Sequence, residues 1–405
     1  MSLLVLAFGA ASCTPDEQPE QKKEEPQKPK KSIYDWSSMA DKAQEQLEKN
    51  FWGGDSYNFY FTHSDGKDKT FNHYWNHAHI LESLMDAYER TGNDFYRQRC
   101  ATVRDRIKKK WPEYHNNYYD DMAWMGIAFV RAYKLFGDDE YLNGAKSIYE
   151  DCLSGWDERT YPIYNGSATL TGGMRWRKSP EDEIKHNACT NWTIATFYGR
   201  LYLLTKDAEV LKSFDKIFDW CASYLQYSKD GYCCTRGTVE TKNPGFFITY
   251  EEGVMIGAYM AKYQIEGKKK YLDIAVNTAD FCLYPNNSMM DSSLRNQGIY
   301  VWRNEGEDNN NGLFKGILCH YLLDLIRMED VADNIRVEYI QFMENCAYYL
   351  NDTSHNYGYL CSYSWTDPDC YVASIPLAAH QSGVILFEVM SVLEKDYINF
   401  LKLVK

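Results

Sequence analysis

The sequence Tyr88-Glu89-Arg90-Thr91-Gly92-Asn93-Asp94-Phe95-Tyr96 recurs as Tyr133-Lys134-Leu135-Phe136-Gly137-Asp138-Asp139-Glu140-Tyr141. Looser copies lie near residues 202–211 and 263–271. Each copy has the pattern of a helix end, a tight turn and a helix start. The repeat therefore predicts helical hairpins along most of the chain.

The helices of this repeat carry an apolar face that one hairpin cannot bury. Apolar residues follow the second turn at three- and four-residue spacing, namely Tyr141, Leu142, Ala145, Ile148, Tyr149 and Cys152. Stacked hairpins bury such faces against one another. The same pattern predicts about twelve helices, at residues 35–51, 73–90, 94–110, 119–136, 138–154, 183–204, 207–226, 249–266, 268–283, 312–328, 331–350 and 376–399.

Twelve helices in six hairpins predict an all-α fold, a closed (α/α)6 toroid. An open superhelix of the tetratricopeptide type is the alternative, but copies spaced by about 45, 69 and 61 residues are too irregular for its period of about 34. Irregular spacing indicates long loops on one rim. Because loops on a rigid scaffold carry binding groups, we expect function in residues 161–183, 227–247, 285–311 and 351–375.

The composition excludes one class of partner and favours another. The chain has 405 residues, of which 44% are hydrophobic and 16% aromatic, so it can bury a large core. Its formal charge of −13 argues against nucleic acid, whose phosphates need a basic face. The aromatic excess fits carbohydrate binding, and it equally fits helices that pack with Tyr and Trp. A neutral substrate and a monomeric protein are expected.

Residues 1–13 predict a lipoprotein signal peptide. An apolar run at residues 3–12 is too short to span a bilayer and ends in small residues before Cys13. The Ala-Ala-Ser-Cys end resembles a bacterial lipobox, which implies cleavage before Cys13 and lipidation of its thiol. Residues 14–32 predict a disordered charged tether, and residues 33–405 a single domain. We expect an outer-membrane lipoprotein, at the cell surface or facing the periplasm, unless the apolar N-terminus arose by chance.

No metal or cofactor is expected. His73 and His77 have metal-like spacing, but no Cys or carboxylate joins them within a turn, so His77 is expected to bind substrate or to lie in the core. The chain has no GxxxxGK[ST], GxSxG or HExxH motif. Most of the cysteines after Cys13 are interpreted as small buried hydrophobic residues, with one or two disulfides left open.

The strongest chemical signal is Tyr118-Tyr119-Asp120-Asp121-Met122-Ala123-Trp124-Met125-Gly126. Two adjacent carboxylates open an amphipathic helix between aromatic side chains, which places two acid/base groups beside surfaces on which a sugar can stack. The alternative is that the pair caps the helix, because free N–H groups and the helix dipole favour anions there. An acid catalyst also needs a raised pKa, whereas a helix N-terminus lowers it.

Six motifs in order resemble those of glycoside hydrolase family 76, over about residues 35–395. They are Trp75-Asn76-His77-Ala78, Tyr118 to Trp124, Gly172-Gly173-Met174-Arg175-Trp176, Asn187-Ala188-Cys189-Thr190-Asn191, Tyr250-Glu251-Glu252-Gly253-Val254-Met255-Ile256-Gly257 and Gly312-Leu313-Phe314-Lys315-Gly316-Ile317. The family consists of endo-α-1,6-mannanases and related transglycosidases on an (α/α)6 barrel, acting with retention. One departure is Glu251-Glu252, where the family often has Asn-Gln.

The resemblance implies that Asp120 is the nucleophile and Asp121 the general acid/base of a retaining glycosidase cleaving α-1,6-mannan. Retention requires two carboxyl groups about 5–5.5 Å apart, which adjacent residues can supply. The matched motifs also supply the expected substrate-binding residues, Trp75, Asn76, His77, Tyr119, Trp124, Gly172, Gly173, Trp176, Asn187, Asn191, Tyr250, Glu251, Phe314 and Lys315.

Two other classes of function stay open at this point. One is another (α/α)6 sugar enzyme, such as an unsaturated glucuronyl hydrolase or an epimerase, which would place its acids differently and, for uronates, need a basic pocket. The other is a non-catalytic glycan-binding lipoprotein on the same fold.

Overall fold

The computed structural model describes residues 32–179 and 185–402. The predicted signal peptide, Cys13 and all but the last residue of the predicted tether lie outside the described residues.

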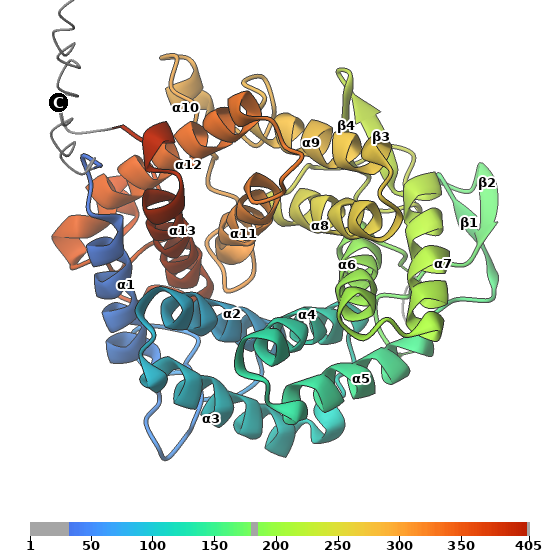
Figure 1. The fold of residues 1–405 in the computed structure, drawn as a ribbon, viewed down its shortest axis with the longest axis horizontal. Helices are drawn as coiled ribbons and strands as arrows, with labels where there is room; N and C mark the ends of the chain where they lie inside the picture. Colours follow the sequence, from blue (N-terminus) through green and yellow to red (C-terminus); the bar gives the residue numbers. More distant parts are fainter. Residues whose placement is uncertain (1–31, 180–184, 403–405) are drawn as a thin grey trace, which may run out of the picture.

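Twelve long helices form two concentric rings in the described part of the chain (Figure 1). The inner ring consists of α2 (Tyr74–Thr91), α4 (Tyr119–Phe136), α6 (Ala188–Thr205), α8 (Thr249–Glu266), α11 (Phe314–Ile326) and α13 (Leu377–Asp396). The outer ring consists of α1 (Trp36–Phe51), α3 (Asp94–Lys110), α5 (Asp139–Leu153), α7 (Ala208–Tyr224), α9 (Lys269–Leu283) and α12 (Asp333–Ser354). The predicted (α/α)6 toroid is therefore confirmed.

Each inner helix packs against two inner neighbours, and the ring closes where α13 meets α2. Five inner helices run through a short turn into the outer helix that covers them, whereas the sixth pair joins the two ends of the chain, α13 and α1. A buried ion pair fixes this junction. Glu388 of α13 accepts hydrogen bonds from Arg90 of α2 at 2.7 and 3.0 Å and from Gln44 of α1 at 3.1 Å.

The short turns explain the sequence repeat. Gly92, Gly137 and Gly267 end α2, α4 and α8 in the left-handed conformation, with φ of 65°, 67° and 67°. Lys206 takes the same place after α6, with φ of 57°. In all four turns this residue donates its backbone N–H to the carbonyl of a tyrosine four residues earlier. A glycine adopts this conformation without the steric penalty of a Cβ atom.

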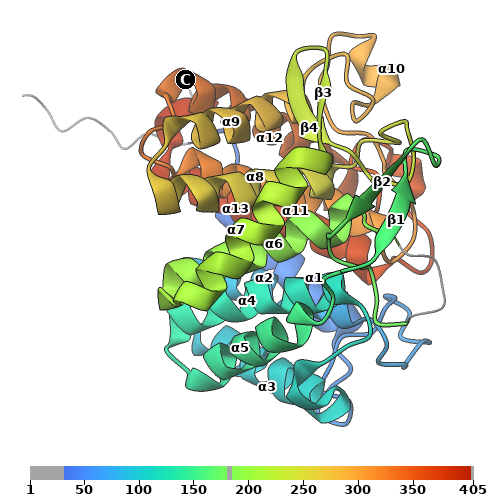
Figure 2. The same cartoon turned by 90° about the vertical axis from the view of Figure 1, so that its right-hand side faces the viewer.

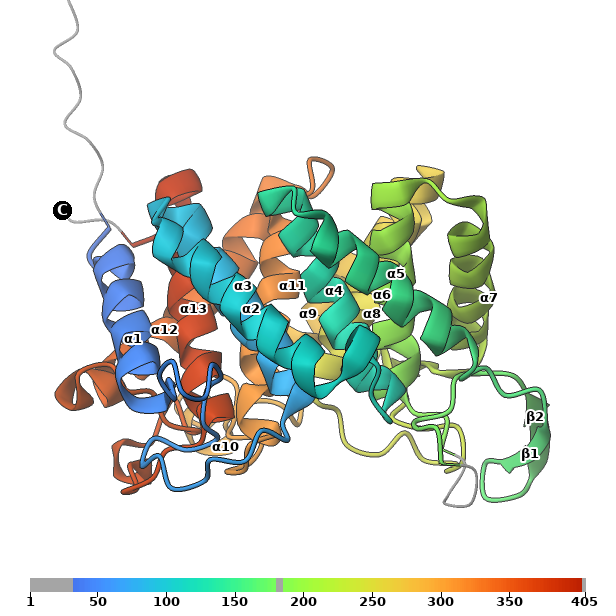
Figure 3. The same ribbon diagram turned by 90° about the horizontal axis from the view of Figure 1, so that it is seen from below.

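The long connections all follow an outer helix and lie together on the opposite rim (Figures 2 and 3). They contain two antiparallel hairpins that the sequence pattern did not predict, β1 (Thr160–Ile163) with β2 (Ala168–Thr171) and β3 (Gln226–Lys229) with β4 (Tyr232–Thr235). They also contain the short α10 (Ser292–Arg295) and four 3-10 turns, η1 (Pro112–Tyr114), η2 (Asn311–Leu313), η3 (His355–Tyr357) and η4 (Pro368–Cys370). A fifth 3-10 turn, η5 (Ile398–Phe400), follows α13.

Charged side chains fill the axis of the ring toward the short turns. Arg131 of α4 bonds Glu82 at 2.5 Å and Asp86 at 2.6 Å, both on α2. His320 of α11 bonds Asp86 at 2.7 Å. Because α2 and α11 are separated in the ring by α13, this last contact lies in the interior of the ring. The ring is thus occupied at one end, and the long-loop rim is the end where a substrate can enter.

The helices of the described segments include none that is long and apolar enough to cross a membrane. The eleven cysteines found there are all free thiols, and nine of them are buried. This agrees with their interpretation as small hydrophobic residues.

The turns make a stability prediction. Gly137→Ala and Gly267→Ala should each lower the free energy of unfolding by about 1 kcal/mol, because an added Cβ meets no other atom within 4 Å but forces a side chain into left-handed backbone. Lys206→Gly should instead raise it by up to about 1 kcal/mol. Urea unfolding of the three variants tests this. Equal losses in all three would contradict the conformational explanation.

Candidate active site

The first turns of the six inner helices converge on the long-loop rim, because each inner helix begins where a long connection ends. Helix N-termini carry partial positive charge and stabilise anions. Asp120 and Asp121 both lie in the first turn of α4, whose N-cap is Tyr118. Neither aspartate is the N-cap residue, whereas both lie in the first turn, where the helix dipole favours their charge.

Asp120 is 8% exposed and is held by side chains from two distant parts of the chain. Its Oδ2 accepts hydrogen bonds from Trp176 Nε1 at 3.1 Å and from Cys189 Sγ at 3.2 Å. Its Oδ1 is buried and accepts none. Burial raises the pKa of Asp120, and Cys189, the nearby backbone N–H groups and Trp176 offset part of that rise. One carboxylate oxygen is therefore fixed and the other is left free to react.

Asp121 lies in a different environment. Its Oδ2 accepts one hydrogen bond, from Asn116 Nδ2 at 3.0 Å. Burial, and then the negative charge of Asp120, raise the pKa of Asp121 well above its ordinary value. Two close carboxylates resist losing both protons. The one with more donors, Asp120, is the better carboxylate, and Asp121 is the better proton donor.

The segment before α6 holds Trp176 over Asp120. Trp176 accepts the backbone N–H of Tyr119 at 3.1 Å through its carbonyl, and its ring lies 5.2 Å from that of Tyr118. Asn191 is fully buried and brackets the same segment, accepting from Met174 N at 2.7 Å and donating to Met174 O at 3.0 Å. Since its amide is used within the protein, we assign Asn191 to positioning Trp176 rather than to contact with substrate.

Gly172 and Gly173 belong to this support as well. Both have left-handed backbone, with φ of 94° and 89°, and a Cβ at either position would collide with a ring, at 2.7 Å from Trp156 and 2.5 Å from Trp220 respectively. They let the chain pass over these rings toward Trp176. Asn187 caps α6 by accepting from Thr190 N at 3.0 Å. These three residues therefore have structural roles that their motifs did not reveal.

Aromatic side chains from four inner helices line the centre of the rim. Trp124 lies 4.7 Å from His79 and 6.4 Å from Tyr250, and Tyr250 lies 4.2 Å from Phe314, all between ring centroids. Trp75 lies 5.6 Å from His79. This line of rings connects α2 with α4, α8 and α11. Tyr119 is packed outside it, with its hydroxyl 3.1 Å from Ser154 Oγ.

The α2 motif is tied to the segment before α11. Trp75 Nε1 donates to Asn310 Oδ1 at 3.3 Å, and Asn76 Nδ2 donates to the carbonyl of Asn309 at 2.9 Å. His77 is buried with both ring nitrogens bonded to backbone, at 3.2 Å to Tyr60 N and 2.7 Å to His73 O. Burial lowers the pKa of His77 to about 4. His77 is thus a neutral core residue, which was the second of the two expectations for it.

Acidic groups gather at the start of α8. Glu252 is fully buried and accepts three hydrogen bonds from the backbone and hydroxyl of Thr235. Glu251 is 5% exposed, and its Oε2 makes no hydrogen bond. On α11, Lys315 donates to the carbonyl of Tyr363 at 3.2 Å and lies 4.2 Å from the ring centroid of Trp365. Glu251 and Lys315 are therefore buried at the site's edge rather than in open solvent.

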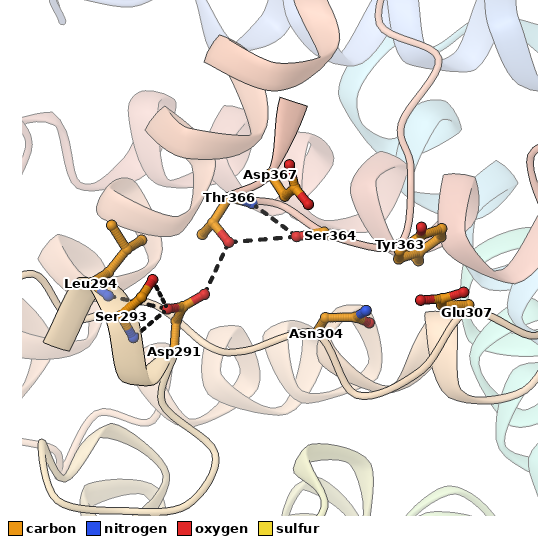
Figure 4. Close-up of a pocket in the computed structure, with 9 residues that line it drawn as sticks. All are labelled: Asp291, Ser293, Leu294, Asn304, Glu307, Tyr363, Ser364, Thr366 and Asp367. Carbon is orange, nitrogen blue, oxygen red and sulfur yellow. Dashed lines mark hydrogen bonds between the residues drawn. The ribbon is translucent and has the colours of Figure 1, made fainter. Parts of the chain in front are cut away.

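A polar groove of about 450 Å³ lies between two of the long connections (Figure 4). The loops that form it come from residues 291–307 and 363–367, and Thr366 joins them by donating to Asp291 at 3.1 Å. Glu307 and Tyr363 face each other across its other end (Figure 4). Carboxylates, hydroxyls, an amide and one aromatic ring line this groove, a set of groups that suits a neutral polyol.

Several of these residues were not selected from the sequence. Asn116, Cys189 and His79 contact Asp121, Asp120 and Trp124 respectively. Cys189 lay inside a quoted motif, and the signal that would have found it is its place in the first turn of an inner helix. Asn116 and His79 carried no such signal, because their contacts depend on how the helices pack.

A toroid of paired helices, with one buried and one half-buried carboxyl group at one mouth, has the architecture of a glycoside hydrolase of the (α/α)6 class. The comparison with known families agrees, since the model of Glycosyl hydrolase family 76 matches residues 35–397. The chain belongs to this family.

Solved structures with this fold include relatives of moderate identity. The GH76A α-1,6-mannanase of Salegentibacter sp. HEL1_6 is 29% identical, with a TM-score of 0.74 over 89% of this chain and 100% of that one. An inactive double-aspartate variant of that enzyme, in complex with α-1,6-mannotetrose, is 28% identical with a TM-score of 0.75 and the same coverage. The Lin0763 protein of Listeria innocua is 26% identical, with a TM-score of 0.75 over 90% and 99% of the two chains. No curated protein matches the chain.

The raised pKa of Asp121 makes a prediction about stability. When folding raises the pKa of an acid, the free energy of unfolding falls as pH rises. The fall begins at the pKa of the unfolded chain, about 3.9 for Asp, and ends above the raised pKa of the folded protein. Asp121→Asn should therefore stabilise the protein at pH 7, by on the order of 1 kcal/mol, with the gain disappearing near pH 4. Thermal unfolding from pH 4 to 8 measures it. Asp55→Asn, on the surface, is the control, and a less stable Asp121→Asn at pH 7 would contradict the assignment.

Proposed function

We propose that the protein is a retaining, endo-acting glycoside hydrolase that cleaves the backbone of α-1,6-mannan. The observation that carries this proposal is the pair Asp120 and Asp121, two adjacent carboxyl groups, one buried and one half-buried, in unlike environments at the mouth of a family 76 toroid. The relatives named as α-1,6-mannanases, one of them bound to α-1,6-mannotetrose, support mannan as the substrate.

The reaction proceeds by double displacement. In the first step Asp120, through its free Oδ1, attacks the anomeric carbon while Asp121 donates its proton to the leaving glycosidic oxygen. A covalent glycosyl-enzyme forms at Asp120. In the second step Asp121, now a carboxylate, takes a proton from water, whose oxygen attacks the same carbon and releases Asp120. Two inversions give net retention.

The change of role at Asp121 follows from its neighbour. While Asp120 is charged, its field keeps the proton on Asp121. Once Asp120 is esterified that charge is lost, the pKa of Asp121 falls, and the group becomes a base for water. Trp176 and Cys189 hold the other oxygen of Asp120 during both steps.

The rim supports a neutral chain-like substrate. Trp75, Trp124, Tyr250 and Phe314 supply ring faces on which sugar units stack. An endo-acting enzyme must hold sugar units on both sides of the cleaved bond, and the polar groove of Figure 4 extends the rim beyond the aromatic line. A uronate would need a basic pocket, whereas the groups around Asp120 and Glu251 are acidic or neutral.

Loss of either aspartate should abolish turnover. Asp120→Asn and Asp121→Asn should each lower kcat on linear α-1,6-mannan by about 10²–10⁴-fold, since each removes a group that acts in both steps. Reducing ends measure the rate, product lengths separate endo from exo action, and proton NMR of the first product reads its anomer. Because an α-linkage is cleaved with retention, the first product should be the α-anomer.

Three results would contradict this proposal. No reducing ends from any α-1,6-mannan would leave a glycan-binding protein. A β-anomeric first product would exclude double displacement. Cleavage of unsaturated uronides instead of mannan would indicate a different toroid enzyme.

We also propose that Cys13 carries a lipid that anchors the protein to the outer membrane, with residues 14–32 as the tether. This rests on the apolar run and the lipobox-like Ala-Ala-Ser-Cys sequence. Cys13→Ser, expressed in a Gram-negative host from the full chain, should move the protein from the membrane to the soluble fraction without changing its specific activity. Continued membrane association of the variant would overturn the lipid assignment.

A further inference from the structure

Glu251 is linked to the nucleophile Asp120 through Tyr250 and Cys189. Its Oε1 accepts from the hydroxyl of Tyr250 at 3.5 Å, and Tyr250 contacts Cys189, which donates to Asp120. The other oxygen, Oε2, is buried and has no hydrogen-bond partner. Asp120 Oδ1 is likewise buried and without a hydrogen-bond partner. A buried polar atom without a partner requires an explanation, and beside a substrate site a ligand hydroxyl can supply the missing partner.

A glycine lies beside the buried Oε2. A Cβ placed on Gly237 would stand 3.8 Å from Oε2, so any larger side chain at this position would project toward it. Gly237 does not have left-handed backbone, and its N–H donates to the carbonyl of Pro244 at 3.0 Å. At this position the 236–248 loop therefore approaches the buried Glu251 with backbone and no side chain.

No cation neutralises Glu251 within the described residues. The charged or titratable groups that face it are Glu252 on its own helix, Glu305 from the segment before α11, Cys189 of α6 and, beyond Cys189, Asp120 of α4. Arg236 is turned away and donates to the carbonyl of Lys242 at 2.8 Å. Lys315 is directed to the carbonyl of Tyr363 at 3.2 Å.

Such surroundings favour a neutral carboxylic acid. Removing a carboxylate from water is unfavourable unless it is paired and hydrogen-bonded, and a neighbouring negative charge adds to the penalty. Glu252 has three bonds to Thr235, whereas Glu251 has one long bond from Tyr250. Burial, and then the neighbouring Glu252, raises the pKa of Glu251 to about 8, and burial raises the pKa of Glu252 to about 8 as well. A neutral acid offers something that an ionised one lacks, an O–H donor.

We propose that Glu251 is a protonated, specificity-determining acid that donates a hydrogen bond from Oε2 to a hydroxyl of the sugar unit bound beside Asp120. This inference rests on the proposed function and names how that site selects a neutral hexose. A sugar hydroxyl accepts the proton of Oε2 and satisfies the buried oxygen. A ligand with a carboxylate in the same place would be repelled by the surrounding acids once any of them ionises.

The role of Glu251 separates from those of the reacting aspartates. Asp121 transfers its proton to the leaving oxygen, whereas Glu251 keeps its proton throughout. An amide can replace such a donor, because the NH2 group of Gln has nearly the same position and shape as the carboxylic O–H. Alanine cannot replace it.

The test uses binding rather than turnover, so that the titration of Asp121 does not interfere. In the full chain carrying Asp121→Asn, calorimetry measures the Kd of α-1,6-mannotetraose between pH 5.5 and 9.5. With Glu251 present, binding should weaken by about tenfold as pH rises through 8, since the donor is lost and a charge appears. Adding Glu251→Gln should retain the low-pH Kd within about threefold and remove most of the weakening, leaving only the part that comes from ionisation of Glu252. Adding Glu251→Ala should weaken binding by about tenfold at pH 6.

The control is Glu158→Gln, the same chemical change on an exposed acid of the same rim, whose side chain is 78% exposed. It should leave the pH dependence unchanged, and melting curves confirm that each variant is folded. If Glu251→Gln loses as much affinity as Glu251→Ala, the group is needed as a charge and the inference is overturned. If neither changes the Kd, Glu251 does not touch the sugar. Failure of the Asp121→Asn parent to bind, with a wild type that does not cleave mannan, overturns the proposed function and this inference together.

Discussion

The fold depends on the closure of the inner ring. An inner helix such as α8 is buried on every face, with residues 249–262 all buried, so it has no polar side to offer to water. Each inner helix therefore needs two inner neighbours and an outer cover, and an incomplete ring would expose an apolar wall. Glu388, Arg90 and Gln44 complete the ring where the two ends of the chain meet. Breaking a buried ion pair of this kind is strongly destabilising, because it leaves an unpaired charge.

Closure with this connectivity makes the two rims unequal. Short turns at one rim leave no room for a site, and the axis there is filled by the charged cluster of Arg131, Asp86 and His320. All six inner N-termini and the long loops lie at the other rim (Figure 3). Carboxylates placed there feel two opposing effects. Helix ends favour their charged forms, and burial favours their neutral forms. The balance differs from one acid to the next with the number of donors each receives.

This balance is what lets chemically similar groups do different work. Asp120 receives two side-chain donors, Asp121 receives one and faces the charge of Asp120, and Glu251 receives a single long bond. These environments suit Asp120 as the nucleophile, Asp121 as the group that gives and takes a proton, and Glu251 as a hydrogen-bond donor that keeps its proton. The expected conflict between a helix N-terminus and a raised pKa is thus resolved by burial and by mutual repulsion, which outweigh the helix dipole at Asp121.

Sequence alone determined the local features of this protein. The repeat at Gly92 and Gly137 predicted the hairpins, and the apolar spacing predicted the twelve long helices. The observed helix limits differ from the predicted ones mainly at α6, which begins after its cap Asn187, and at the end of α12. The pair Asp120-Asp121 is also a local feature, because the two acids are consecutive in the sequence.

Tertiary structure decided which residues support the site. Asn191 brackets Met174, His77 bonds Tyr60 and Cys189 reaches Asp120 across 69 positions. These contacts, like the β-hairpins in the loops, join segments whose proximity arises only when the ring closes, and no periodic pattern in the chain records them.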